Sequence, residues 1–116
     1  MSDPRPGRRV FRTQNLELKP YDLDGPLQPD ISYAELSHDS RRGRGSYLMR
    51  MAPGAATIPH AHDCREEYLI LEGEAIEDDG TVLKPGDWIV YEPGSRHSTR
   101  TVTGCVLLGV DWDPPD

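Results

Sequence analysis

The sequence predicts an all-β domain built as a small closed barrel or jelly roll. Eleven glycines and eleven prolines are scattered through the 116 residues, and no stretch free of both is longer than 13 residues. This distribution excludes long helices. Short apolar runs, each bounded by a turn, provide eight to ten strand candidates. Because 116 residues suffice for one hydrophobic core, we expect a single domain over residues 10–116.

The predicted elements begin after a polar N-terminal segment. Residues 1–9 carry almost no apolar side chains and are expected to form a flexible arm. The basic stretch 40–45 is expected to be a solvated loop without a chemical role. A strand over residues 46–52 then leads into the first of three Pro-Gly turns, which are Pro53-Gly54, Pro85-Gly86 and Pro93-Gly94. Proline sets φ at the second turn position and glycine accepts a positive φ at the third.

Three further runs predict strands between and after these turns. Residues 66–72 are apolar on both faces, with Tyr68 and Ile70 on one and Leu69 and Leu71 on the other, so neither face is expected to be fully open to water. The sequence Asp78-Asp79-Gly80 predicts a tight antiparallel hairpin. Residues 106–112 alternate between two sets of side chains and predict a final strand with one strongly buried face.

The charge and the cysteine content limit the class of partner and the compartment. Thirteen basic against twenty acidic residues leave a net charge of −7, which argues against a nucleic-acid partner. We find no apolar run long enough for a membrane span and no secretory signal, so a cytoplasmic protein without a membrane partner is expected. Cys64 and Cys105 are expected to be reduced thiols.

Three of the four histidines form a pattern typical of a metal site. His60 and His62 are separated by one residue and project to the same side of a strand, and Glu66 follows four residues later. His97 comes directly after the third Pro-Gly turn. Three imidazoles and one carboxylate suit one divalent transition metal, Fe(II), Zn(II), Mn(II), Ni(II) or Cu(II). His38 has no partner at a suitable spacing and is expected at the surface.

These spacings resemble the two sequence motifs of the cupin family. The first motif, G-x5-H-x-H-x3-E-x6-G, is met in full by Gly54, His60, His62, Glu66 and Gly73. The second, G-x5-P-x-G-x2-H-x3-N, is met by Gly86, Gly94 and His97, with Glu92 and Thr101 in place of its proline and asparagine. Within the family, residues 46–112 are most similar to the cupin domain of ChrR-type anti-sigma factors. The resemblance implies a double-stranded β-helix barrel, a metal inside it, and a homodimer.

The pattern supports two functional hypotheses. Four protein ligands leave two positions open on an octahedral ion, which favours a non-haem, dioxygenase-type enzyme acting on a small dicarbonyl-like substrate, similar to the acetylacetone-cleaving cupins. Strand parity sends Tyr68 into the same cavity, where it is a candidate catalytic proton donor, although a core tyrosine explains it equally well. A lyase is a weaker variant, because Thr57 stands where the similar dimethylsulfoniopropionate-cleaving cupins carry a tyrosine.

The second hypothesis is a metal-dependent sensor or binding module without turnover. The resemblance to ChrR-type cupins suggests it, and Cys64, close to the expected ligands, is a candidate thiol for reporting oxidants. An inert, buried Cys64 is the simpler interpretation. We do not expect a complete anti-sigma factor, because a barrel over residues 10–116 leaves no room for a helical domain that grips a sigma factor.

Overall fold

The computed structural model describes residues 5–39 and 41–115. These residues form eleven strands and one short 3-10 helix, η1 (Thr13–Asn15). The strands are β1 (Lys19–Tyr21), β2 (Gln28–Asp39), β3 (Arg44–Met51), β4 (His60–Ala61), β5 (Arg65–Gly73), β6 (Ala75–Glu77), β7 (Val82–Leu83), β8 (Trp88–Tyr91), β9 (Arg96–His97), β10 (Thr99–Arg100) and β11 (Cys105–Trp112). Strands outnumber the eight to ten expected, because four of them are only two residues long. No helix in this part of the chain is long and apolar enough to cross a membrane.

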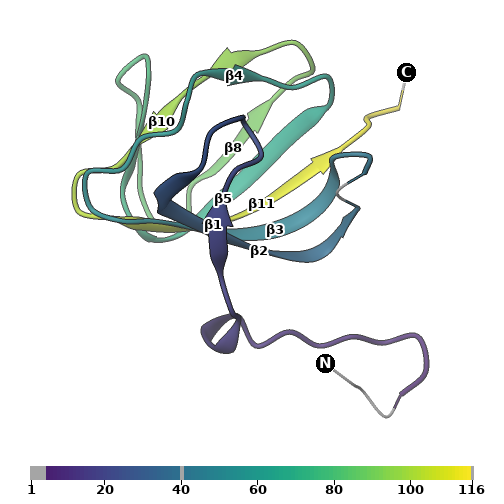
Figure 1. Ribbon diagram of the computed structural model, residues 1–116. Coiled ribbons are helices and arrows are strands. Elements are labelled where there is room, and N and C mark those ends of the chain that lie inside the picture. Colours follow the sequence, from purple (N-terminus) through teal and green to yellow (C-terminus); the bar gives the residue numbers. More distant parts are fainter. Residues whose placement is uncertain (1–4, 40, 116) are drawn as a thin grey trace.

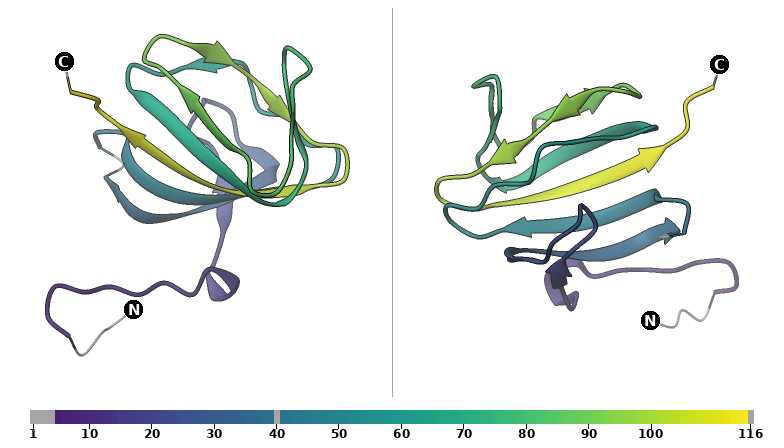
Figure 2. Two further views of the ribbon diagram at one scale, coloured as in Figure 1. Left: turned by 180° about the vertical axis from the view of Figure 1, so that it is seen from behind. Right: turned by 45° about the horizontal axis from the view of Figure 1, so that its top comes forward.

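The strands form one large sheet that curves beneath two small ones (Figure 1). The large sheet has the order β1-β2-β3-β11-β5-β8, and the small sheets have the orders β10-β6-β7 and β4-β9. All neighbouring strands are antiparallel. The two further views show the small sheets facing the large one across the interior (Figure 2). The predicted all-β jelly-roll barrel is therefore confirmed.

The predicted turns are present at the expected positions. In each of the three Pro-Gly turns a backbone hydrogen bond of 2.9 to 3.1 Å joins the fourth residue to the first. Their glycines, Gly54, Gly86 and Gly94, have φ angles of 83°, 92° and 89°. The hairpin at residues 78–80 joins β6 to β7, as predicted. The chain direction at the barrel corners is thus determined by local sequence.

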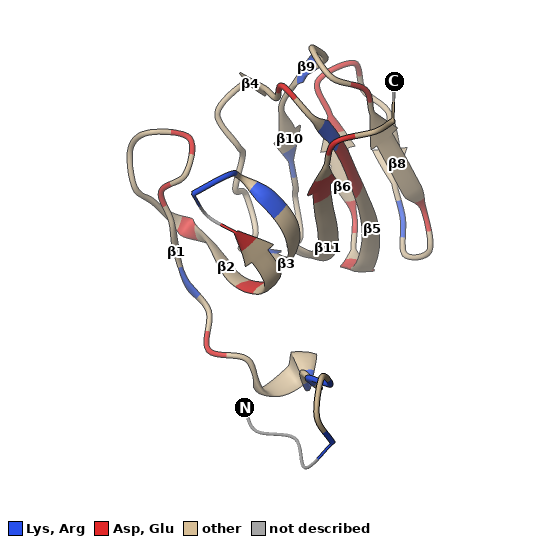
Figure 3. Cartoon of the chain, turned by 90° about the vertical axis from the view of Figure 1, so that its right-hand side faces the viewer, with Lys and Arg blue, Asp and Glu red and all other residues tan. Residues whose placement is uncertain are grey.

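The basic hairpin turn between β2 and β3 has a structural role that the sequence did not predict. Figure 3 shows basic residues, coloured blue, gathered at this turn. Arg44, at the start of β3, lies 2.8 Å from Asp113 and 3.2 Å from Asp63, so it links the hairpin to segments beyond β11 and β4. Arg41 is solvated as expected, whereas Ser40 lies outside the described residues. Of the expected N-terminal arm, residues 5–9 are exposed and residues 1–4 lie outside the described part.

Cross-strand register arranges the inner face of the large sheet in rows. One row across β2, β3, β11 and β5 is apolar and contains Tyr33, Met49, Leu107 and Ile70. The next row contains Glu35, Tyr47, Gly109, Tyr68 and Ile89, and the row after it contains His38, Gly45, Asp111, Glu66 and Tyr91. Polar side chains are therefore concentrated at one end of the barrel interior, and apolar side chains fill the other end.

The register of β2 is irregular at its polar end. Pairing with β3 shifts between Glu35 and His38, so two residues of β2, Leu36 and Ser37, lie opposite one residue of β3, Ser46. Because of this bulge, Glu35 and His38 both line the interior cavity although they are three residues apart. The prediction that His38 lies at the surface is therefore wrong: its side chain is only 6 % exposed.

The final strand was predicted correctly, but the face that carries most of its large apolar side chains does not point into the core. Cys105, Leu107, Gly109 and Asp111 are buried, whereas the intervening Val106, Leu108, Val110 and Trp112 are only half-buried on the outer face. Gly109 has a steric reason to lack a side chain, since an added Cβ would lie 2.4 Å from the Tyr47 ring. The inner face of β11 thus combines a polar residue, Asp111, with a glycine whose missing side chain leaves room for the Tyr47 ring.

We predict that Gly109→Ala destabilises the protein by about 1–3 kcal/mol, because the methyl group overpacks the Tyr47 ring. Urea denaturation of the metal-free protein measures the change. In a Tyr47→Ala background the same substitution should have a much smaller effect. An equal effect in both backgrounds would contradict this explanation.

Candidate metal centre

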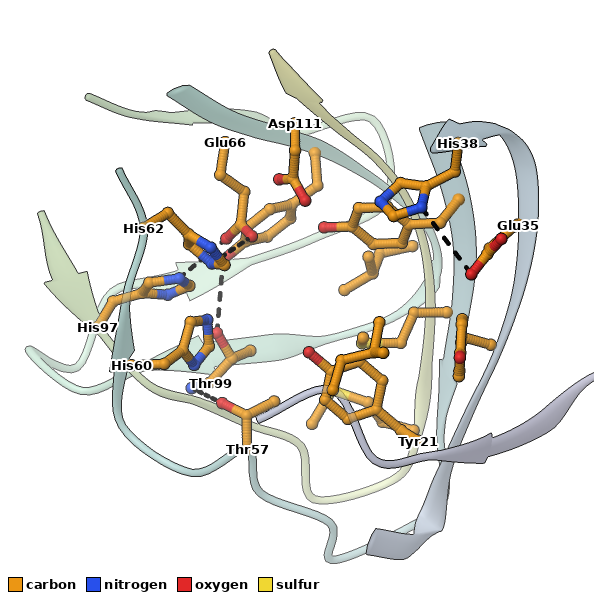
Figure 4. Close-up of a pocket in the computed structure, with 17 residues that line it drawn as sticks. Tyr21, Glu35, His38, Thr57, His60, His62, Glu66, His97, Thr99 and Asp111 are labelled. Atoms are coloured by element: carbon orange, nitrogen blue, oxygen red, sulfur yellow. Dashed lines mark hydrogen bonds and ion pairs between the residues drawn. The ribbon is translucent and has the colours of Figure 1, made fainter. Parts of the chain in front are cut away.

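Four side chains from three segments converge at the polar end of the cavity (Figure 4). They are His60 in β4, His62 just after it, Glu66 in β5 and His97 in β9. One potential ligand atom from each lies within 4.8 Å of all the others. The structure therefore brings together the four residues that the sequence predicted as metal ligands.

Local structure explains how residues so far apart in the sequence meet. His60 and His97 are direct partners in the β4–β9 pair, and their ring centroids are 4.5 Å apart. The ring of His62 lies 4.8 Å from that of His60, on the same side, as strand parity predicted. The backbone N–H of Gly94 donates to the His62 carbonyl at 2.9 Å. The third Pro-Gly turn is thus tied directly to the first pair of histidines.

Glu66 is the electrostatic centre of this group. Its two carboxylate oxygens lie 2.8 Å from His62 Nε2 and 2.9 Å from His97 Nε2. Burial acts to raise the pKa of Glu66, but the two histidines outweigh it and hold this pKa below its ordinary value. The Glu66 carboxylate in turn raises the pKa of His62. Without a metal, the protons on the histidines balance the buried negative charge.

His97 is influenced by a second carboxylate, Glu77, on the far side of its ring. Its Nδ1 lies 3.7 Å from Glu77 Oε2. Burial acts to lower the pKa of His97, but Glu66 and Glu77 together outweigh it and raise the pKa to about 9. Glu77 also accepts hydrogen bonds from Thr99 Oγ1, at 2.6 Å, and from the Tyr68 hydroxyl. A carboxylate behind a ligating imidazole orients the ring and strengthens it as a ligand.

His60 is oriented in a similar way by the backbone. Its Nδ1 donates to the carbonyl oxygen of Ile58 at 2.7 Å, which leaves Nε2 as the nitrogen available to an ion. Asp24 lies 3.6 Å from the same Nδ1. Two of the three imidazoles therefore have an outer partner on the nitrogen that faces away from the cluster.

The donor set fits a single transition-metal ion. Ligands about 2.1 Å from an octahedral ion are about 3 to 4.2 Å apart, close to the separations found here. His62 Nε2 lies near Glu66 but has no hydrogen-bond partner in the described part of the chain. Nitrogen-rich ligands of this kind suit a borderline divalent ion rather than calcium. The cluster can thus bind one divalent transition-metal ion.

A cavity of about 60 Å³ extends from the cluster into the barrel. Besides the four ligands, it is lined by Tyr21, Leu23, Tyr33, Glu35, His38, Tyr47, Met49, Met51, Thr57, Tyr68, Thr99, Leu107 and Asp111. Asp111 pairs directly with Glu66 across β11 and β5, and burial, reinforced by the Glu66 carboxylate, raises its pKa to about 7. Sequence reasoning missed Asp111, although its place in the alternation of the last strand was a usable signal.

The two other residues that the sequence singled out, Tyr68 and Cys64, lie close to this site. Tyr68 lines the cavity, but its hydroxyl donates to Glu77 and lies 3.4 Å from Thr99 Oγ1, so its role as a proton donor stays a prediction. Cys64 forms no disulfide and is only 2 % exposed, and burial raises its thiol pKa. An oxidant sensor needs an accessible thiolate, so this environment favours the inert interpretation. Cys105 is likewise buried and forms no disulfide.

Comparison with known proteins agrees with this geometry. The family model described as "ChrR Cupin-like domain" matches residues 18–113. No curated protein sequence matches the chain. Among solved structures, the polyketide cyclase RemF from Streptomyces resistomycificus is similar with a TM-score of 0.70 and 25 % identity, over 93 % of this chain and 82 % of that one.

Two further structures share the fold at lower identity. An RmlC-like cupin from Shewanella frigidimarina has a TM-score of 0.71 and 18 % identity, over 95 % of both chains. A chain of the Rhodobacter sphaeroides complex of SigE with the anti-sigma ChrR has a TM-score of 0.69 and 18 % identity, over 87 % of this chain. This chain spans about half of the latter, 51 %.

We predict that metal binding strengthens as the pH rises, because a metal must displace the proton held by His97, whose pKa is about 9. Displacement of this one proton makes the apparent Ni(II) affinity rise on the order of 100-fold between about pH 6.5 and 8.5. Competition against a chelating dye measures it. An affinity that is constant over this range would contradict the proton assignment.

Proposed function

We propose that this chain, which belongs to the ChrR cupin-like domain family, binds one divalent transition metal through His60, His62, Glu66 and His97 and acts as a dioxygenase-type enzyme. Its substrate in this proposal is a small, dicarbonyl-like organic molecule. The observation that carries the proposal is the convergence of the four ligand atoms within 4.8 Å at the wall of an interior cavity. A purely structural ion would need no such space beside it.

Different residues of the chain have different roles at such a site. When bound, the metal supplies Lewis acidity and, as Fe(II), electron transfer to O₂. Glu66 and the three histidines would hold such an ion with four ligands, which would leave room for two oxygens of a substrate. Glu77 and the Ile58 carbonyl hold His97 and His60 in orientation. The aromatic and methionine side chains of the wall exclude water from the reacting groups.

The similarity to RemF supports catalysis in a barrel of this kind, because that protein is a polyketide cyclase of 25 % identity. The alternative function is a metal-dependent binding or sensing module without turnover. It is favoured by the family itself, named for ChrR, and by the neighbour that lies in a complex of SigE with ChrR. The buried Cys64 gives this alternative no support.

We expect anaerobically purified protein to contain about one divalent metal per chain, and the Fe(II)-loaded form to consume O₂ when pentane-2,4-dione or a related dicarbonyl is added. His97→Ala, which removes a ligand, should lose both the metal and O₂ uptake. Arg50→Gln, on the exposed outer face of β3, is the matched control and should retain both.

The outcomes distinguish the two functions. Tightly bound metal without O₂ uptake for any dicarbonyl tested would favour the binding module. If wild type and a His60→Ala, His62→Ala double variant were both metal-free and equally stable, the metal site itself would be disproved.

We also propose a homodimer that forms through the outer face of β5 and β8. Trp88 and Val90 are 53 % and 45 % exposed on the edge strand, and Leu71 is exposed beside them on β5. An apolar surface of this kind marks an interaction site. Light scattering should then report twice the 13.0 kDa of one chain, and Trp88→Glu should reduce it to the monomer mass. A monomeric wild type would contradict this part of the proposal.

A further inference from the structure

A second polar pair, His38 and Asp111, lies in the same cavity. The His38 side chain is 6 % exposed and Asp111 is 9 % exposed. His38 Nδ1 and Asp111 Oδ1 have no hydrogen-bond partner within the described ranges. The carboxylate nearest to His38 Nδ1, that of Glu35, is 3.9 Å away, too far for a hydrogen bond. Buried polar atoms are rarely left unpaired, so two in one cavity point to a ligand that completes them.

The sheet places these two residues so that one ligand group can reach both. They belong to the same cross-strand row, with only Gly45 of β3 between them. A Cβ at Gly45 would lie 2.0 Å from the Ser37 carbonyl oxygen, so this position must remain glycine. No side chain of this row therefore separates His38 from Asp111. Figure 4 shows Asp111 between Glu66 on one side and His38 on the other.

The cavity surface next to this polar row is aromatic and apolar. Tyr21, Tyr33, Tyr47 and Met49 line it, and the Tyr47 ring meets the His38 ring edge to face at 6.3 Å. Aromatic walls favour a flat, unsaturated molecule. A ligand that reaches from the metal cluster to His38 therefore has polar groups along the row of Glu66, Asp111 and His38 and a planar apolar body against the neighbouring aromatic side chains.

We propose that His38 and Asp111 form a specificity site for a hydroxyl group on the substrate, in the same cross-strand row as the metal-ligand candidate Glu66. This inference rests on the proposed function, because it concerns the substrate of that same site. A hydroxyl donates to the Asp111 carboxylate and accepts from the His38 N–H, so it completes both atoms. A carbonyl or carboxylate only accepts, and an ammonium only donates, so each leaves one of the two unpaired. The substrate class is a small, planar hydroxylated compound with a chelating oxygen head.

The test uses Zn(II)-loaded protein, which binds ligands without turnover, with benzoate and its 3-hydroxy and 4-hydroxy derivatives as probes. We expect isothermal titration calorimetry at pH 8 to show at least one hydroxybenzoate binding about tenfold or more tightly than benzoate. In Asp111→Asn and in His38→Phe this preference should fall below about twofold. Arg50→Gln, outside the cavity, is the control and should keep it.

The controls separate failure of this inference from failure of the proposed function. The zinc content of each protein is measured first, since His38 and Asp111 are not metal ligands and their variants should keep a full zinc load. Wild type that binds zinc but shows no preference for a hydroxyl, or binds none of the probes, overturns the specificity site and leaves the metal site intact. Wild type that binds no zinc overturns both.

Discussion

The barrel interior depends on one buried carboxylate. Glu66 lies within 3 Å of two imidazoles that come from different segments, and the two small-sheet strands and the third Pro-Gly turn serve to bring those imidazoles to it. A carboxylate at this depth is stable only while positive charge surrounds it. Protonated histidines or a divalent cation can supply that charge, and they compete for the same nitrogens. The same constraint that keeps these histidines protonated in the absence of a metal therefore allows the cluster to bind one.

The cross-strand register separates polar from apolar side chains in the rest of the cavity. Because neighbouring strands pair residue by residue, one row holds Glu66, Asp111 and His38, and a row two steps further along contains only apolar and aromatic side chains. The interior thus changes from polar to apolar along the barrel axis. In the proposed function this gradient orients the substrate, with its chelating atoms toward the cluster and its apolar body against Tyr47 and Met49, which line the cavity.

Local patterns allowed much of this to be predicted from the sequence. The spacing of His60, His62 and Glu66, the three Pro-Gly turns and the hairpin at residues 78–80 depend on near neighbours in the chain, and all are present. Strand β2 and the inward position of His38 were missed, because a bulge breaks the period of two on which parity depends. The buried face of β11 was obscured for another reason, since a functional cavity places Gly109 and Asp111 where a core would have apolar residues.

The bulge in β2 also bears on how such a protein can diversify. The four metal-binding side chains belong to β4, β5 and β9 and their flanks, whereas His38 lies on a strand at the opposite side of the large sheet. Deletion of one bulged residue would restore regular pairing and leave His38 two residues after Glu35, so both would still face the cavity and no histidine of the cluster would move. The inward position of His38 can therefore survive a change in the length of β2, and substitutions on this strand can alter the proposed substrate preference while the cluster is conserved.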